Sequence, residues 1–299
     1  MTLADLGEDA ALSHILPGLP QTDTVLVGPG DDCAVLEVPS DPDNLSLLKT
    51  DTIVEKVHFL SSTDPEKVGW KAAARVVSDF AAMGGQPDHL VVSIALPANT
   101  TIDWLRGLYR GLTSCADCYT FSLCGGETTS VPEGSSKVIT VSGTGRVRKN
   151  HLVTRFEGKP GDQLYVTGKL GGSFPSERHL TFSPRLAEST FLVSQFSPTA
   201  MMDLSDGLAT DLPRLAKASH CGFQTNETSL PCHDGCTPQQ AMSDGEDYEL
   251  LFSIPAASSP ELLHAWPANL APLTQIGQLT HDSKSEIPSG FQHFQPPRD

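Results

Sequence analysis

The sequence predicts a mixed α/β and α+β fold built from two domains. Its 299 residues are enough for one large domain or for two of ordinary size. In the first half of the chain, apolar runs typical of strands alternate with segments of helical periodicity. Around residues 146–161 the chain turns polar and rich in Gly and basic residues, as at a junction between domains. We therefore expect an N-terminal α/β domain over residues 1–147 and a C-terminal α+β domain over residues 148–299.

The clearest element of the first half is a helix over residues 65–83. Asp64 is a suitable N-cap, Pro65 occupies the first helical position, and two glycines follow the predicted end. A second helix is expected after Thr101, with an apolar stripe formed by Leu105, Leu108, Leu112 and Cys115. The strands expected in this half cover residues 45–49, 90–96, 119–124 and 137–143.

The second half mixes strands and helices less regularly. Pro213 falls inside one predicted helix and is expected to kink or restart it. The expected strands lie near residues 163–167, 200–203, 248–254 and 273–277, and the expected helices near residues 207–219 and 258–265.

Composition excludes several classes of function. The net charge of −16 disfavours binding to nucleic acid or to anionic membranes, and would repel ATP unless divalent cations bridge carboxylates to phosphates. The longest apolar stretch, near residues 90–96, is too short to span a bilayer. The acidic N-terminus does not resemble a signal peptide, so we expect a cytoplasmic protein with reduced thiols. The alternative for the cysteines is a zinc site built from Cys115, Cys118, Cys232 and Cys236.

Two acidic segments of the first half point to a cation site. Asp31 and Asp32 follow Gly28-Pro29-Gly30 in a loop before the expected strand 33–38, and their oxygens suit a hard cation. A simple turn stabilised by aspartate is the alternative. Thr50-Asp51-Thr52 follows a predicted strand, where sites in α/β sheets are often found.

Asp79 is the most informative acid of the sequence. It lies in the middle of the apolar face that Val68, Ala72, Val76 and Met83 form on the predicted helix. A carboxylate that faces a core is costly unless it binds a metal or pairs with a buried Arg or Lys. The sequence leaves both of these alternatives open.

Further acids accompany glycines in the rest of the chain. Asp203 and Ser205 share one side of a predicted strand, and Asp206 begins a helix, where it serves either as a cap or beside a phosphate. Residues 125–129 (GGETT) and 245–249 (GEDYE) read as two further acidic turns. No Walker A motif, kinase glycine loop or G-x-S-x-G elbow is present. Carboxylates with glycine loops indicate a multi-metal site for phosphate chemistry.

Seven motifs occur in order along the chain: GDDCAVL at 30–36, TDTIVEKVHF at 50–59, KAAARVVSDFAAMGGQP at 71–87, GGETT at 125–129, LVTRFEGKPGDQLYVTGKLG at 152–171, MDLSDGLATDL at 202–212 and GEDYELLF at 245–252. Together they resemble the thiamine-monophosphate kinase family. The resemblance implies the fold of aminoimidazole ribonucleotide synthetase and selenophosphate synthetase, with an N-terminal domain that dimerises through its sheet. It also implies Mg²⁺-dependent transfer of phosphate from ATP to thiamine monophosphate, giving thiamine diphosphate.

The resemblance also implies roles for individual residues. The expected metal ligands are Asp32, Thr50, Asp51, Asp79, Glu127, Asp203 and Asp206, of which Asp32, Asp51, Asp79 and Asp206 are the catalytic carboxylates. Expected nucleotide contacts are Gly126, Arg155 and Ser205, and expected substrate contacts are His58, Glu246 and Phe291.

Four departures from the family pattern stand near these positions. Glu127 replaces a usual Asp, Lys49 replaces Ser or Thr, Asp244 replaces Gly, and the segment 171–185 is shorter than usual. Strand alternation places Lys49 on the same face as Asp51, so its ammonium is expected to reach the carboxylates, unless it extends to solvent. The alternatives for function are another ATP-dependent enzyme of this superfamily, or a non-catalytic relative that binds thiamine phosphate or nucleotide.

Overall fold

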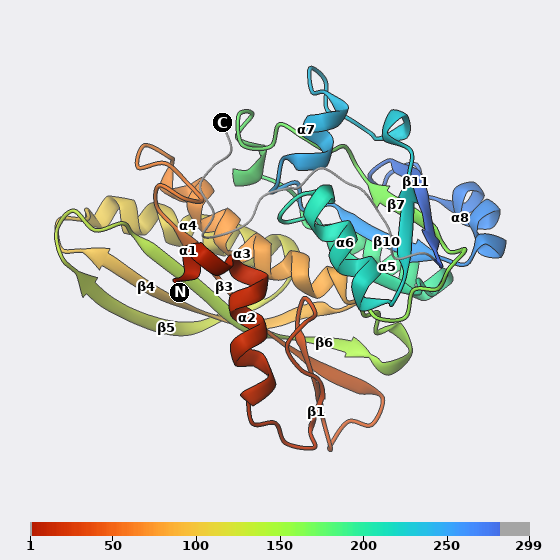
Figure 1. Ribbon diagram of the computed structural model, residues 1–299. Helices are drawn as coiled ribbons and strands as arrows, with labels where there is room; N and C mark the ends of the chain where they lie inside the picture. The colour runs from red at the N-terminus through yellow and green to blue at the C-terminus, as the bar shows by residue number, and fades with distance from the viewer. Residues whose placement is uncertain (1, 282–299) are drawn as a thin grey trace.

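The computed structural model describes residues 2–281, which form two β-sheets with helices packed on them (Figure 1). The first sheet has six strands in the order β1-β2-β3-β6-β4-β5, and all neighbours are antiparallel except the parallel pair β4 and β5. Its strands are β1 (Val25–Val27), β2 (Ala34–Glu37), β3 (Asn44–Val54), β4 (Gln86–Pro97), β5 (Ser122–Val131) and β6 (Val138–Arg148).

Helices α3 (Pro65–Ala82) and α4 (Ile102–Tyr119) pack against each other on one face of this sheet (Figure 1). The predicted caps form: the Asp64 carboxylate accepts the Glu66 N–H at 3.0 Å, and the Thr101 hydroxyl accepts the Trp104 N–H at 3.2 Å. The short helices α1 (Leu3–Leu6) and α2 (Glu8–Ile15) precede β1 and contain no buried residue.

The second sheet has five antiparallel strands in the order β8-β10-β7-β11-β9. The strands are β7 (Gln163–Thr167), β8 (Ala200–Asp203), β9 (Gly222–Thr225), β10 (Leu250–Ile254) and β11 (Leu273–Thr280). The helices are α5 (Leu186–Gln195), α6 (Leu208–Ala218), α7 (Pro238–Ser243) and α8 (Ser259–Ala265). The two-domain α/β and α+β architecture is thus confirmed, and the predicted domain boundary falls at the end of β6.

Three local predictions are wrong. Thr50-Asp51-Thr52 does not follow a strand but lies inside β3, because β3 pairs with β6 along its whole length. Gly125-Gly126-Glu127 is not a turn but part of β5. A Cβ atom on Gly126 would lie 1.8 Å from the Val92 carbonyl oxygen, so this glycine permits close approach of β5 to β4. Helix α6 continues through Pro213 as one element, so the predicted restart is wrong, while the alternative of a kink stays a prediction.

The C-terminal end of α3 lies between the two halves of the molecule. This helix contacts β3, β4 and β6 of the first sheet and also β8 and α5 of the second half. The opposite face of the first sheet carries no helix among the described residues, and exposes apolar side chains such as Leu48 and Val91. Within residues 2–281, no helix is both long and apolar enough to cross a membrane.

Candidate active site

Three ionisable side chains follow one another at four-residue intervals on α3. Lys71, Arg75 and Asp79 therefore lie on one side of the helix. All three side chains are at most 13% exposed, although they carry charge. Each pairs with an oppositely charged residue from another part of the chain: Lys71 with Glu246, Arg75 with Asp51, and Asp79 with Lys49. This side of α3 therefore connects the groups of the site.

The deepest part of the site is a cluster of three carboxylates. Asp32 comes from the loop before β2, Asp79 from α3, and Asp203 from the end of β8, and one oxygen of each lies within 4.8 Å of the others. Asp32 Oδ2 is buried and has no hydrogen-bond partner among the described residues. Burial, reinforced by the charge of Asp32, raises the pKa of Asp203 to about 7. Converging carboxylate oxygens with an unused lone pair fit a divalent cation such as Mg²⁺.

Basic side chains contact most of the acids around this cluster. Lys49 Nζ lies 2.7 Å from Asp79 Oδ1, and Arg75 Nε lies 3.1 Å from Asp51 Oδ2. Arg155 pairs with Asp31 and Asp32, and Arg214 pairs with Asp206 and Asp211. Although burial disfavours its ammonium, the charges of Asp79 and Asp51 raise the pKa of Lys49.

The pairing of Asp79 with a cation, which the sequence left open, is therefore present, and its partner Lys49 is partly buried. Lys49 also reaches the carboxylates, as the alternation of β3 predicted, instead of extending to solvent. Since Asp79 also converges on Asp32 and Asp203, its pairing with Lys49 and its predicted role as a metal ligand are compatible.

Three predicted contact residues lie away from the cluster. The Thr50 hydroxyl lies 2.7 Å from Ser142 Oγ, on the sheet face opposite α3, so only the main chain of Thr50 remains near Asp51. Gly126 and Glu127 lie on the edge strand β5, which two strands separate from β3. Strand spacing then places them on the order of 14 Å from Asp51.

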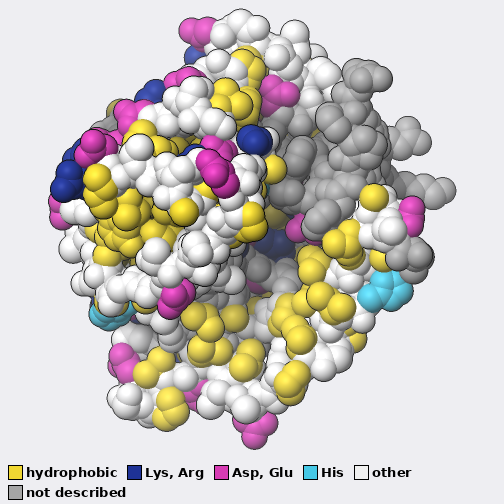
Figure 2. Space-filling model, turned by 90° about the vertical axis from the view of Figure 1, so that its left-hand side faces the viewer, with side chains coloured by type: hydrophobic (Ala, Val, Ile, Leu, Met, Phe, Trp, Pro, Cys, Tyr) yellow, Lys and Arg dark blue, Asp and Glu magenta, His cyan; other side chains and the backbone are white. Residues whose placement is uncertain are grey.

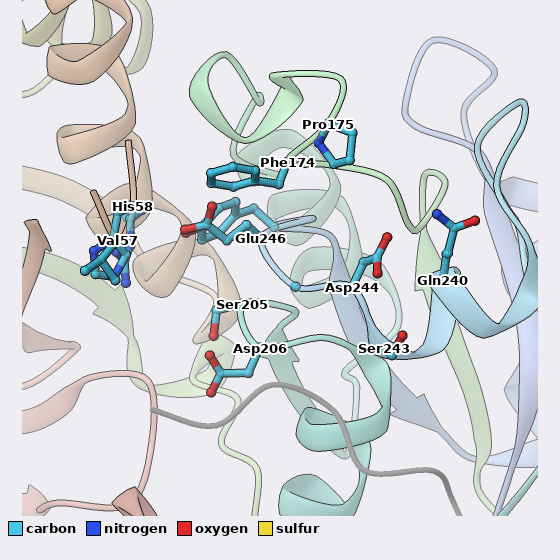
Figure 3. Close-up of a pocket in the computed structure, with 13 residues that line it drawn as sticks. Val57, His58, Phe174, Pro175, Ser205, Asp206, Gln240, Ser243, Asp244 and Glu246 are labelled. Atoms are coloured by element: carbon cyan, nitrogen blue, oxygen red, sulfur yellow. The ribbon is translucent and has the colours of Figure 1, made fainter. Parts of the chain in front are cut away.

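Two adjoining cavities open between the halves of the molecule beside this cluster. The first, of about 470 Å³, is lined by Phe174, Glu246 and Tyr248 among others, and the second, of about 460 Å³, by Glu8 and Asp51 among others. They share a wall formed by Val57, His58, Arg75, Ser205 and Asp206. In Figure 3, Val57 and His58 approach the first cavity from one side, and Phe174, Ser205, Asp206 and Glu246 from the other. Figure 2 shows a face of the molecule with a hollow near its centre and apolar side chains grouped along part of its rim.

Comparison with known proteins finds the same two-domain organisation. Residues 30–147 match the N-terminal domain of AIR synthase related proteins, and residues 159–288 match the C-terminal domain of that family. The thiamine-monophosphate kinase of Haemophilus influenzae is 32% identical over 91% of this chain and 93% of its own length. That of Escherichia coli K12 is 35% identical over 86% of this chain and 85% of its own.

The chain belongs to the thiamine-monophosphate kinase family. A solved structure described as AaThiL complexed with AMPPCP and TMP superposes with a TM-score of 0.84 and 29% identity. The superposition covers 98% of this chain and 99% of that one, so the family fold extends across both domains.

In this thiamine-monophosphate kinase family member, Glu246 is held by a buried network. Lys71 Nζ lies 2.8 Å from both Glu246 oxygens and 2.7 Å from His179 Nδ1, and His179 lies 3.0 Å from Glu246. Although burial opposes ionisation, His179 and Lys71 lower the pKa of Glu246 to about 2. Burial lowers the pKa of Lys71 to about 8 against the attraction of Glu246. Glu246 and Tyr248 both have positive φ angles, 63° and 52°, which is backbone strain of the kind found at functional sites.

Sequence reasoning did not single out Lys71, Arg75, Phe174 or His179. The spacing of Lys71 and Arg75 before Asp79 was a usable signal, because a charged residue on an apolar helix face is unusual wherever it occurs. Phe174 and His179, which stack with ring centroids 4.5 Å apart, come from an irregular segment without any periodic signal. The predicted substrate contact Phe291 lies outside the described residues.

Proposed function

We propose that this protein transfers the γ-phosphoryl group of ATP to thiamine monophosphate, with Mg²⁺, to give thiamine diphosphate. The observation that supports this best is the joining of two cavities at one wall. One cavity adjoins the carboxylates Asp51 and Asp206, and the other contains Glu246 and Phe174. Two anionic substrates bound one in each cavity would place their phosphates at the shared wall.

The chemistry places few demands on proton transfer. The nucleophile is an oxygen of the substrate phosphate, whose second pKa near 6 leaves it largely deprotonated at pH 7. The protein must therefore align two anions and stabilise the charge that develops between them. Asp32, Asp79 and Asp203 would hold Mg²⁺, which supplies positive charge to the phosphates. Arg155 adds a fixed cation beside Asp32.

The cavity of Glu246 suits the thiamine portion of the substrate. Thiamine carries a cationic thiazolium ring and an aminopyrimidine ring. The ionised Glu246 carboxylate provides a negative acceptor, and the half-exposed ring of Phe174 provides a face for a cation–π contact. His58 stands at the wall between the two cavities, where the thiamine and phosphate portions would join.

The proposal includes a homodimer formed by the open face of the first sheet. On this face Leu48 and Val91 are exposed, and the hydroxyls of Thr52 and Thr140 lie 2.9 Å apart in a hydrogen-bonded pair. Glu127 lies opposite Ser93 on the same face. In such a dimer, β5 of one copy faces the other copy, so any role of Gly126 and Glu127 belongs to a site shared between copies.

The test is an assay of ATP consumption with thiamine monophosphate, with thiamine, and without acceptor, each with and without Mg²⁺. We expect thiamine diphosphate to form only with thiamine monophosphate and Mg²⁺, because free thiamine has no phosphate nucleophile. ATP use without either acceptor would favour another reaction of this superfamily. Binding of both ligands without turnover would favour a non-catalytic relative.

A further inference from the structure

Arg75 occupies an unusual position between the two cavities. It lies on α3 between Lys71, which serves the Glu246 side, and Asp79, which serves the carboxylate cluster. Its side chain is only 13% exposed, yet it belongs to the lining of both cavities. The guanidinium therefore stands at the boundary where the substrate phosphate and the γ-phosphate of ATP would meet.

The contacts of Arg75 leave donor capacity unused. Its hydrogen bonds to Asp51 Oδ1 and to the Thr52 carbonyl oxygen are both long, at 3.4 Å. Nε is buried 3.1 Å from Asp51 Oδ2 but has no partner in hydrogen-bond geometry within residues 2–281. A guanidinium has five N–H donors in a planar fork, and two long contacts do not saturate them. A group that only neutralised Asp51 would be expected to form shorter contacts with both carboxylate oxygens.

We infer that Arg75 is a catalytic residue that binds the substrate phosphate at the junction of the cavities and stabilises the charge transferred between the phosphates. This inference rests on the proposed function. The planar fork matches the oxygens of a phosphate, and Arg keeps its charge at every pH at which the enzyme works. The ion pair with Asp51 holds the guanidinium in place at the cavity wall, so it remains available to a phosphate there.

The inference predicts a loss that depends on the phosphate of the ligand. In Arg75→Gln, the affinity for thiamine monophosphate should fall about 10- to 100-fold, while the affinity for thiamine changes little. kcat should fall about 100-fold or more, because the charge is most needed in the transition state. Arg75→Lys keeps the ion pair with Asp51 but lacks the planar guanidinium. It should therefore fold normally and show a partial loss of both the affinity for thiamine monophosphate and kcat.

Calorimetric titration with thiamine monophosphate and with thiamine, together with steady-state kinetics, tests this on the full-length protein. Arg110→Gln is the matched control, because Arg110 pairs with Glu66 at 3.2 Å on the exposed outer surface of α4. If Arg75→Gln and Arg75→Lys keep the native preference for thiamine monophosphate and the native kcat, the inference is wrong. If they weaken thiamine and thiamine monophosphate equally, Arg75 has only a structural role, and the inference is again wrong. A native protein without preference for thiamine monophosphate over thiamine would overturn the proposed function itself.

Discussion

The ion pair of Glu246 gives a quantitative prediction for Glu246→Gln. Lys71 and His179 lower the pKa of Glu246 from an ordinary 4.5 to about 2. By linkage, this difference corresponds to about 3 kcal/mol of folding stability at neutral pH, because each pH unit is worth about 1.4 kcal/mol. The Glu246 side chain is 21% exposed, so solvent screens the pair only partly. At roughly 2–3 °C per kcal/mol for a chain of this size, Tm should fall by about 6–9 °C.

The pH dependence distinguishes this mechanism from a general loss of packing. A lowered carboxyl pKa stabilises the fold fully above pH 4.5 and progressively less as the pH falls toward 2. The Tm difference between the native protein and Glu246→Gln should therefore close as the pH falls from about 4.5 toward 2. It should also narrow as the pH rises toward about 8, because Lys71, whose pKa Glu246 raises, loses its proton at a lower pH in the variant than in the native protein.

Two controls accompany the melts, recorded by scanning fluorimetry across this pH range. Glu177→Gln makes the same substitution in an exposed pair, 2.8 Å from Lys67, and should shift stability much less than Glu246→Gln, because solvent screens this pair. The double variant Lys71→Met/Glu246→Gln removes both charges and should be less destabilised than the two single variants combined. A shift below about 1 kcal/mol at pH 7, or a difference that does not change with pH, would refute the linkage argument.

Two further predictions concern the carboxylate cluster. Asp79→Asn should abolish turnover and, without Mg²⁺, lower stability by up to about 3 kcal/mol, because it leaves the Lys49 ammonium without its 2.7 Å partner. A melting temperature that is unchanged or higher would mean that repulsion from Asp32 and Asp203 outweighs the ion pair. Lys49→Ser should increase the number of Mg²⁺ ions bound in the nucleotide complex and the Mg²⁺ concentration needed for activity, because a fixed positive charge is lost. An unchanged metal count and Mg²⁺ dependence would exclude the replacement of a metal ion by the ammonium.

Local signals sufficed for the elements that carry the site. The N-cap Asp64, Pro65 and the apolar spacing predict the bounds of α3 to within one residue, and the apolar spacing alone identifies Asp79 as a buried acid. The same reasoning placed β7 and β8, whose short apolar runs end at polar residues. Helix caps and apolar spacing depend on residues that are close together in the chain, so they can be recognised in a single sequence.

Non-local pairing accounts for most of what the sequence did not reveal. The extent of β3 is set by its register with β6, about ninety residues later, which no local pattern records. Gly125 and Gly126 suggested a turn, but hydrogen bonding to β4 and the close approach to Val92 make them part of a strand. The network of Lys71, His179 and Glu246 likewise combines segments more than sixty residues apart.

The excess of acidic side chains in the cleft gives a physical reason for the protein to need divalent cations when phosphates bind. Acidic side chains exceed their basic partners by three, the acids being Asp31, Asp32, Asp51, Asp79, Asp203, Asp206 and Asp211 and the bases Lys49, Arg75, Arg155 and Arg214. Asp203 has the Ser78 hydroxyl as its partner instead of a cation, and its pKa of about 7 reflects burial beside Asp32. Phosphates entering such a cleft would be repelled unless further positive charge entered with them. One of these acids without a basic partner, Asp203, lies beside Asp32 and Asp79 in the carboxylate cluster, so a cation bound there and the phosphates are directed to the same place. Each basic side chain that the protein supplies reduces the charge that Mg²⁺ must provide, and this is the physical reason to expect that Lys49 changes the metal requirement.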